Sequence, residues 1–302
     1  MAAVASARFM GRGDEYKADA SARDAFRAMM SSVDIKGTIV IGEGDPSELG
    51  TLKAGELIGT GKSLELDIVA DPLEGSKICA HGGFNAISAL AIGGKGQLLA
   101  APDIYMNKLA VGPIGRGVID ILESPLENLK RLADVKKCRI QDLTAIILDR
   151  ARHANLLENL RSSGARIMLI RDGDLAGALA TCREASGVDI LFGSGGAQEG
   201  VMAAAAMRCL GGEIQAQFTP KDESEIKLLK NLGPFAMGVM KEHDMAKGDV
   251  MFCATGISSG HLLEGVQFHP WGAITHSLVM RSQSGTVRSI MAEHHFDKKP
   301  VY

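Results

Sequence analysis

The chain has 302 residues, of which 46% are hydrophobic and 23% are charged, and its formal net charge is -3. This length can bury the core of two packed lobes or of one large α/β unit. A weakly acidic chain without a basic block is not expected to bind nucleic acid as its main partner. An anionic substrate would therefore need local cations, from bound metals or from arginines.

The five cysteines are scattered along the chain and form no Cys-x-x-Cys pair. An odd number without paired spacing favours a reducing cytoplasm over a disulfide framework. The first seven residues lack the charged region of a signal peptide, and no run is apolar for long enough to span a membrane. We therefore expect a cytoplasmic protein that has no membrane partner.

The first part of the chain, residues 1–125, is expected to form an α+β lobe on a largely antiparallel sheet. A helix is predicted over 22–33. The run 67–70, with β-branched Ile68 and Val69, predicts a buried strand that Asp71-Pro72 ends, because proline cannot donate to a sheet ladder. Further strands are predicted at 38–41, 85–92, 97–101 and 108–111.

The second part, residues 126–302, is expected to form an α/β lobe. Strands are predicted at 144–148, 165–170 and 188–192, and helices at 153–162, 175–185 and 198–210. This alternation predicts a parallel sheet with a ligand crevice at the carboxyl ends of its strands. Polar or glycine-rich loops follow those ends at 149–152, 171–174 and 193–196. Strand-like runs between 250 and 290 are expected to complete a sheet.

The turn after the run 67–70 carries the strongest chemical signal. It presents two carboxylates, Asp71 and Glu74, followed by Gly75 and the hydroxyl of Ser76. Hard oxygen ligands beside free backbone N–H groups suit a divalent cation that holds a phosphate. Ser76 either acts on a metal-bound water or caps the helix that follows, and both interpretations stay open.

This turn resembles the Asp-Pro-(Leu/Ile)-(Asp/Glu)-Gly-(Thr/Ser) motif of the lithium-sensitive, metal-dependent phosphomonoesterases. Three other segments narrow the resemblance: Gly11-Arg12-Gly13-Asp14 with Ala18-Asp19, then 37–44, and then 101–106. In this order they resemble class II fructose-1,6-bisphosphatases, the bacterial type that includes dual fructose/sedoheptulose bisphosphatases. The resemblance runs from about Arg8 to about His294. It implies a layered α/β sugar-phosphatase fold, with an α+β metal-binding lobe followed by a parallel-sheet α/β lobe.

The resemblance also implies roles for individual residues. The implied metal ligands are Asp19, Glu43, Asp71, Glu74 and Glu199, with the backbone carbonyl of Leu73 as an additional ligand. The implied catalytic residues are Asp71, Glu74 and Ser76. The implied substrate-binding residues are Glu74, Gly75, Ser76, Tyr105, Arg150, Ala151, Arg152, Asp172, Gly173, Asp174 and Gly196. Two alternatives stay open, because Glu199 also suits the dipole of a helix start and Asp-Gly-Asp is also a common turn.

The activity implied by the resemblance is hydrolysis of the 1-phosphate of fructose 1,6-bisphosphate, with Mn²⁺ or Mg²⁺, in gluconeogenesis. Sedoheptulose 1,7-bisphosphate is a further candidate substrate, and a homo-oligomer, dimer or tetramer, is expected. One rival hypothesis is an inositol-phosphate or other sugar monophosphatase with the same metal core. A second is a catalytically inactive regulatory protein that binds sugar phosphates. The complete set of five carboxylates favours an enzyme.

Overall fold

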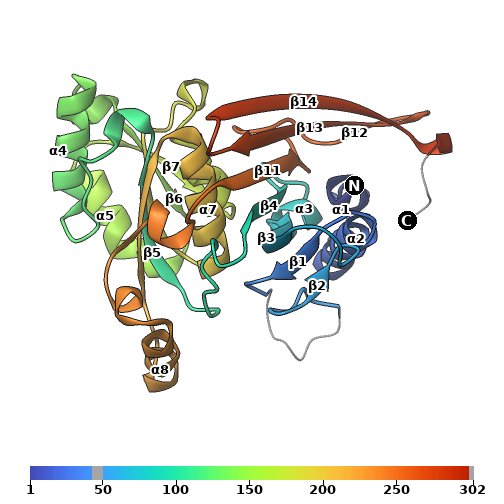
Figure 1. Cartoon of the computed structure of the whole chain (residues 1–302). Coiled ribbons are helices and arrows are strands. Elements are labelled where there is room, and N and C mark those ends of the chain that lie inside the picture. The colour runs from blue at the N-terminus through green and yellow to red at the C-terminus, as the bar shows by residue number, and fades with distance from the viewer. Residues whose placement is uncertain (43–49, 299–302) are drawn as a thin grey trace. The chain divides into compact units, whose positions relative to one another are not determined.

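Two compact units make up the chain, and each has its own sheet and core. Unit 1 consists of Met1–Leu98 and Gly248–Tyr302, and unit 2 of Leu99–Lys247. The structure, a computed structural model, describes residues 1–42 and 50–298 (Figure 1). These units differ from the division after residue 125 that the sequence suggests, because strands from Val250 onward pair with strands of the first hundred residues.

Unit 1 is built on a mixed sheet of eight strands among the described residues. Seven of them follow the order β12-β13-β11-β4-β3-β1-β2. The eighth, β14, lies outside this order and pairs with β13. The strands are β1 (Lys36–Ile39), β2 (Leu57–Ile58), β3 (Glu65–Glu74), β4 (Ile87–Gly94), β11 (Val250–Gly256), β12 (Gln267–His269), β13 (Gly272–Arg281) and β14 (Thr286–His295). The pair β1–β3 is parallel and the other pairs are antiparallel, as expected for this part of the chain.

Two strand predictions for this region are wrong. The predicted strand 97–101 is reduced to a single bridge at Leu98. The predicted stop at Asp71-Pro72 does not occur, because β3 continues to Glu74 through an irregularity between Asp71 and Glu74. Asp71 lies opposite Ala89 of β4 and Glu74 lies opposite Ile87, so β3 carries one extra residue, a β-bulge. Proline is tolerated at a bulge, because the ladder is already interrupted there.

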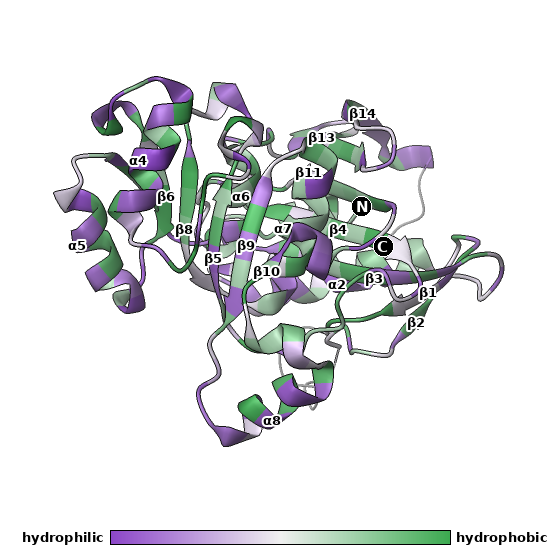
Figure 2. Ribbon diagram, turned by 60° about the vertical axis from the view of Figure 1, so that its left-hand side comes forward, coloured by the Kyte–Doolittle hydropathy of each residue, from purple (hydrophilic) through white to green (hydrophobic). Residues whose placement is uncertain are grey.

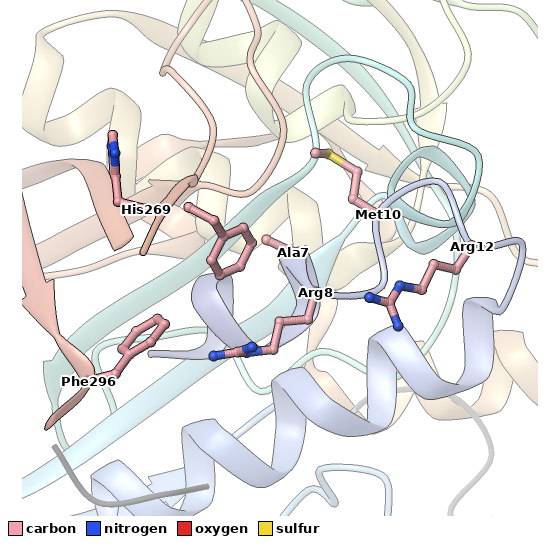
Figure 3. Close-up of a pocket in the computed structure, with 7 residues that line it drawn as sticks. Ala7, Arg8, Met10, Arg12, His269 and Phe296 are labelled. Carbon is pink, nitrogen blue, oxygen red and sulfur yellow. The ribbon is translucent and has the colours of Figure 1, made fainter. Parts of the chain in front are cut away.

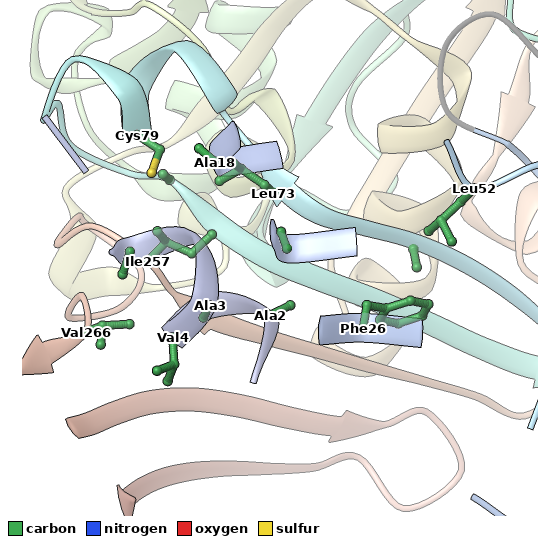
Figure 4. Packing of buried hydrophobic residues seen from close by; sticks show 14 of the residues in the cluster. Ala2, Ala3, Val4, Ala18, Phe26, Leu52, Leu73, Cys79, Ile257 and Val266 are labelled. Carbon is green, nitrogen blue, oxygen red and sulfur yellow. The ribbon is translucent and has the colours of Figure 1, made fainter. Parts of the chain in front are cut away.

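Helices α1 (Ala2–Ala7), α2 (Glu15–Met30) and α3 (Ser76–Ala80) complete the described part of unit 1. Helix α2 begins seven residues before the predicted start because the Asp14 side chain accepts a hydrogen bond from Lys17 N and caps the helix. Figure 4 shows Ala2, Ala3, Val4 and Phe26 within the buried cluster that joins these helices to the sheet. This core fixes α2 and α3 beside β3.

Unit 2 is built on a six-stranded sheet in the order β10-β9-β5-β8-β6-β7, again counted over the described residues. Its strands are β5 (Met106–Val111), β6 (Thr144–Leu148), β7 (Arg166–Ile170), β8 (Ile190–Gly195), β9 (Glu213–Phe218) and β10 (Met240–Lys241). The three predicted strands of the alternating region pair in parallel, β7 with β6 and β6 with β8. The expectation of a parallel sheet holds only for these three, since β5 and β9 join in antiparallel fashion.

Helices cover both faces of the unit 2 sheet. They are α4 (Pro125–Lys136), α5 (Ala154–Ser162), α6 (Asp174–Ala180), α7 (Ala197–Leu210), α8 (Glu223–Leu232) and α9 (Glu242–Met245). Ala145 and Ile147 of β6 pack in one core with Leu129 of α4, whereas Ile146 points to Gly177 of α6. Figure 2 shows β6 as largely hydrophobic, as expected for a strand that is buried on both faces.

The fold class is therefore a mixed α/β architecture, as expected. In residues 1–42 and 50–298, every helix is too short or too polar to cross a membrane.

Candidate active site

The bulge at the end of β3 positions the predicted catalytic turn in unit 1. The Asp71 carboxylate accepts a hydrogen bond from Leu73 N at 3.0 Å. Glu74 is the last residue of the strand and is only 4% exposed. The extra residue of the bulge redirects the chain between these two carboxylates, so both are presented at the strand end.

Gly75 and Ser76 turn the chain from the strand into α3. Gly75 has φ +90, a left-handed conformation that L side chains rarely adopt, and a Cβ here would lie 3.3 Å from Ile78 Cδ1. Gly75 is itself the N-cap of α3, so the N-cap interpretation of Ser76 is wrong. The Ser76 hydroxyl instead lies 3.4 Å from Asp19 Oδ1 and 3.5 Å from the Leu73 carbonyl oxygen.

Helix α2 brings Asp19 to this turn together with a cation that sequence analysis missed. Arg23 Nη1 forms an ion pair with Asp19 Oδ2, one helical turn along α2. Arg23 is buried whereas Asp19 is partly exposed, and the ion pair holds the Asp19 carboxylate in one orientation. The spacing of four residues suits one helix face, but the predicted helix began at residue 22 and left Asp19 outside it, so this pair was missed.

The ligand chemistry in unit 1 fits a hard divalent cation. Asp19, Asp71, Glu74 and the Leu73 carbonyl offer oxygen donors around one bulge, the donor type preferred by Mg²⁺ and Mn²⁺. Over the ranges 1–42 and 50–298, however, no three acidic, histidine or cysteine side chains gather closely enough to hold an ion. Glu43, a predicted ligand, lies outside the described residues, and Glu199 belongs to unit 2.

In unit 2, the predicted substrate residues Tyr105 and Arg152 are in contact. The Arg152 guanidinium lies over the Tyr105 ring, 5.1 Å from its centroid. Its Nε donates to Ser194 Oγ at 3.0 Å, and its Nη2 donates to the Ser194 carbonyl oxygen at 2.6 Å. Lys221, which sequence analysis did not single out, lies over the same ring at 5.3 Å. Two cations therefore share one aromatic residue, a suitable surface for an anionic group.

His153 fastens the loop that carries Arg150 and Arg152. Its Nδ1 lies 2.9 Å from the Leu148 carbonyl oxygen, and its Nε2 accepts a hydrogen bond from Ser194 N at 2.9 Å. These partners define a neutral imidazole with the proton on Nδ1. Burial lowers the pKa of His153 below its ordinary value, although the bond to Leu148 acts in the opposite direction. The sequence interpretation treated His153 only as the start of a helix.

The other predicted loops also meet around the ends of the parallel strands in unit 2. Arg150 Nη2 lies 3.7 Å from Asp172 Oδ1, which links the loop after β6 to the loop after β7. Gly173 has φ +86 and is the N-cap of α6, so Asp174 begins a helix and Asp172 lies in the bend before it. Ala151 is exposed in the short 3₁₀ helix that precedes α5.

A buried cluster of charges forms at the end of β8. Lys108 Nζ of β5 lies 2.7 Å from Asp174 Oδ2, and the Lys108 side chain is 3% exposed. Sequence analysis missed Lys108, although a lysine directly before the apolar run Leu109–Val111 was a visible signal. Cβ atoms at Gly195 and Gly196 would lie 2.5 Å from Asp174 Oδ2 and 2.4 Å from Glu199 Oε2, so both carboxylates need glycine beside them.

Glu199 lies in the first turn of α7, where an acidic residue favours the helix dipole. Its Oε2 atom is buried and has no hydrogen-bond partner among the residues that the structure describes. Burial raises the pKa of Glu199 above its ordinary value; the Lys108 charge opposes this shift and the Asp174 charge adds to it. A buried, unsatisfied carboxylate oxygen is suited to a cation, which is consistent with the ligand role expected for this residue.

Comparison with known proteins identifies the family. The model of the family described as bacterial fructose-1,6-bisphosphatase, glpX-encoded, matches residues 1–294. A D-fructose 1,6-bisphosphatase class 2/sedoheptulose 1,7-bisphosphatase of Synechococcus elongatus is 42% identical, over 98% of this chain and 93% of the relative. The fructose-1,6-bisphosphatase 1 class 2 of Escherichia coli is 40% identical, over 99% of this chain and 93% of the relative. The chain therefore belongs to the bacterial, glpX-encoded fructose-1,6-bisphosphatases, a family of metal-dependent phosphatases.

Proposed function

We propose that this protein hydrolyses the 1-phosphate of fructose 1,6-bisphosphate, giving fructose 6-phosphate and phosphate, with Mn²⁺ or Mg²⁺ as its cofactor. Sedoheptulose 1,7-bisphosphate is the proposed second substrate. One observation supports metal-dependent hydrolysis most directly. Asp19 and Ser76 meet beside the bulge of β3 that presents Asp71 and Glu74. The names of the relatives, which cover nearly the whole chain, support the choice of substrates.

In unit 1, we assign Asp19, Asp71, Glu74 and the Leu73 carbonyl to holding metal ions. Glu43, which lies outside the described residues, and Glu199 in unit 2 are also assigned as metal ligands. When bound, such ions supply an activated water and neutralise charge that develops on the phosphoryl oxygens. Arg23 keeps Asp19 oriented through its ion pair. Ser76 orients the attacking water through its hydroxyl. Because these carboxylates serve as ligands, the reaction needs no phosphorylated enzyme.

In unit 2, we assign Arg150 and Arg152 to the second phosphate of the substrate. An arginine donates two parallel hydrogen bonds to a phosphate, and Arg152 is already oriented by Ser194 and Tyr105. Asp172 and Asp174 are assigned to sugar hydroxyls, because carboxylates accept from such donors. Lys108 holds Asp174 in place through their ion pair.

A substrate panel tests this function. Phosphate release is measured from fructose 1,6-bisphosphate, sedoheptulose 1,7-bisphosphate and inositol 1-phosphate, each with Mg²⁺, with Mn²⁺ and with a chelator. Metal-dependent release from the two sugar bisphosphates alone is the expected result. Release only from inositol 1-phosphate would favour a monophosphatase. Folded protein that binds sugar phosphate but releases none would favour the inactive regulatory protein.

The role of Arg152 has its own variant. Arg152→Lys keeps the charge but loses the planar fork, so KM for fructose 1,6-bisphosphate should rise roughly ten-fold while kcat changes less. Arg139→Lys is the matched control, because Arg139 is exposed and its ion pair with Asp142 is local. Equal KM values for Arg152→Lys and the control would remove Arg152 from the phosphate site.

We also propose a homo-oligomer and a reducing, cytoplasmic location. Strand β14 is an edge of the unit 1 sheet in the described chain, and its Ile290 and Met291 are exposed. Such an edge favours pairing with a second copy. The five cysteines are free, which suits a reducing compartment. Sedimentation analysis that gives a monomer at micromolar concentration would contradict the oligomer.

A further inference from the structure

Unit 1 contains a cavity of about 480 Å³ that the proposed function does not use. Its wall comes from the loop after α1 and from the region of β12 and β14. The residues that matter here are Arg8, Met10, Arg12, Phe268, His269 and Phe296. Figure 3 shows Arg8 and Arg12 extending from one loop, with Phe296 across from Arg8. The lining therefore combines two guanidinium groups with aromatic and apolar side chains.

Arg8 is held in a defined position by aromatic rings. Its guanidinium carbon lies 5.4 Å from the centroid of Phe268 and 5.0 Å from the centroid of Phe296. Cation–π contacts use the faces of these rings and leave the N–H groups of the guanidinium free to donate. A guanidinium that is fixed in this way loses less side-chain entropy when it binds an anion.

Arg12 comes from a loop that is fixed by backbone hydrogen bonds. Gly11 N donates to the Cys79 carbonyl oxygen at 2.9 Å, and Gly13 N donates to the Ala80 carbonyl oxygen at 2.7 Å. These two bonds hold the loop to α3 on both sides of Arg12. The cavity thus presents a second cation from a segment that does not need to be ordered by a ligand.

Among the described residues, no acidic side chain balances the charge of the cavity. Its lining residues include no aspartate or glutamate, and within residues 1–42 and 50–298 neither Arg8 nor Arg12 forms an ion pair. Both side chains are exposed to solvent. An anion with two acceptor oxygens would replace water with charge-assisted hydrogen bonds, and Met10, Phe268 and Phe296 would cover an apolar body.

From these observations we propose that the cavity binds a small organic anion, with a phosphate or phosphonate head held by Arg8 and Arg12 and a compact aromatic or apolar body against the phenylalanines. Arg8 and Arg12 are outside the residues assigned to catalysis. Binding here is therefore separable from the proposed function by mutation.

Calorimetric titration of the metal-free protein with phenylphosphonate tests the proposal, since this probe is not a phosphate ester and cannot be hydrolysed as one. Arg8→Gln/Arg12→Gln should weaken its affinity roughly ten-fold or more, because each charge-assisted hydrogen bond contributes at least about that factor. The control Arg288→Gln removes an exposed arginine of β14 and should leave the affinity unchanged. Arg150→Gln/Arg152→Gln should also leave it unchanged. Methylphosphonate, which lacks the aromatic body, should bind more weakly than phenylphosphonate.

Three outcomes would overturn the proposal: no saturable binding to the wild type, equal affinity for the Arg8→Gln/Arg12→Gln variant, or loss of binding only in Arg150→Gln/Arg152→Gln. Equal affinity for methylphosphonate would refute the role of the phenylalanines. Arg12→Gln alone provides the decisive comparison if the double variant unfolds at a lower temperature, because Arg12 is exposed and its loss leaves Arg8 and the phenylalanines in place.

Discussion

His153 is expected to be the group that couples the stability of unit 2 to pH and to the position of Arg152. Replacing it by leucine removes the hydrogen bonds to the Leu148 carbonyl oxygen and to Ser194 N. The His153 side chain is only 5% exposed, so both partners would be left unsatisfied in a buried environment. An unsatisfied buried polar group costs about 1–3 kcal/mol, so the two together should lower the free energy of unfolding by about 2–6 kcal/mol. His243→Leu is the control, because His243 is exposed.

The effect should depend on pH in a defined direction. Burial places the pKa of folded His153 below 6.5, so the unfolded chain binds more protons between these two values. The contribution of His153 to stability is therefore complete above pH 6.5 and is lost as the pH falls through the folded pKa. His153→Leu should be most destabilised at pH 7–8, and its difference from the wild type should shrink towards pH 5.

Urea unfolding between pH 5 and pH 8 measures this difference, and hydrogen exchange at the Ser194 amide reports the local bond. Faster exchange at Ser194 and a higher KM for fructose 1,6-bisphosphate should accompany the loss of stability, because Ser194 orients Arg152. A destabilisation as small as that of His243→Leu, or one that is the same at every pH, would refute this reasoning.

Two further predictions concern the neighbourhood of the site. Gly75→Ala and Gly96→Ala should each cost about 1–2 kcal/mol of stability, because both glycines have positive φ. Only Gly75→Ala should also slow phosphate release, since its new methyl meets Ile78 whereas the site at Gly96 is open; equal turnover in the two variants would contradict this. Lys108→Met should lower the free energy of unfolding by about 3–5 kcal/mol, because Asp174 would lose a buried partner. Lys130→Met, at an exposed pair of 3.9 Å, should change it by less than about 1 kcal/mol in the same urea titration, and similar losses in both would show that the Lys108 pair is not special.

Local patterns predicted the alternating region of the fold best. The run 144–148 forms β6 without any difference in its bounds, because five apolar or β-branched residues between polar loops fit only a buried strand. The earlier start of α2 was also readable, since Asp14 followed by a polar first turn is an N-cap signal. Which strands pair with one another could not be predicted from the sequence. Strand β5 pairs with β8 and β9 of unit 2, and β11 pairs with β4, across long separations that periodicity does not report.

The candidate site also has features that the sequence predicted and features that it did not. The turn at Asp71–Ser76 was found from its residues, but the bulge that shapes it requires the register of β4. The pairing of Arg23 with Asp19 was missed, because the predicted helix began at residue 22 and left Asp19 outside it. The partnership of Lys108 with Asp174 was missed as well, because 66 residues separate them. The role of His153 depends on hydrogen bonds to two separate strands, so no local pattern reveals it.

Metal-dependent phosphate release from fructose 1,6-bisphosphate by the wild type and by Asp71→Asn tests the central claim most directly. The substitution keeps the size of the side chain but removes the charge of a proposed ligand. Release by the wild type should require Mn²⁺ or Mg²⁺ and should fall roughly a hundred-fold or more in the folded variant, since even a residue that only orients a ligand typically costs ten- to a hundred-fold. Near-wild-type release by Asp71→Asn, or release that persists in a chelator, would contradict the account.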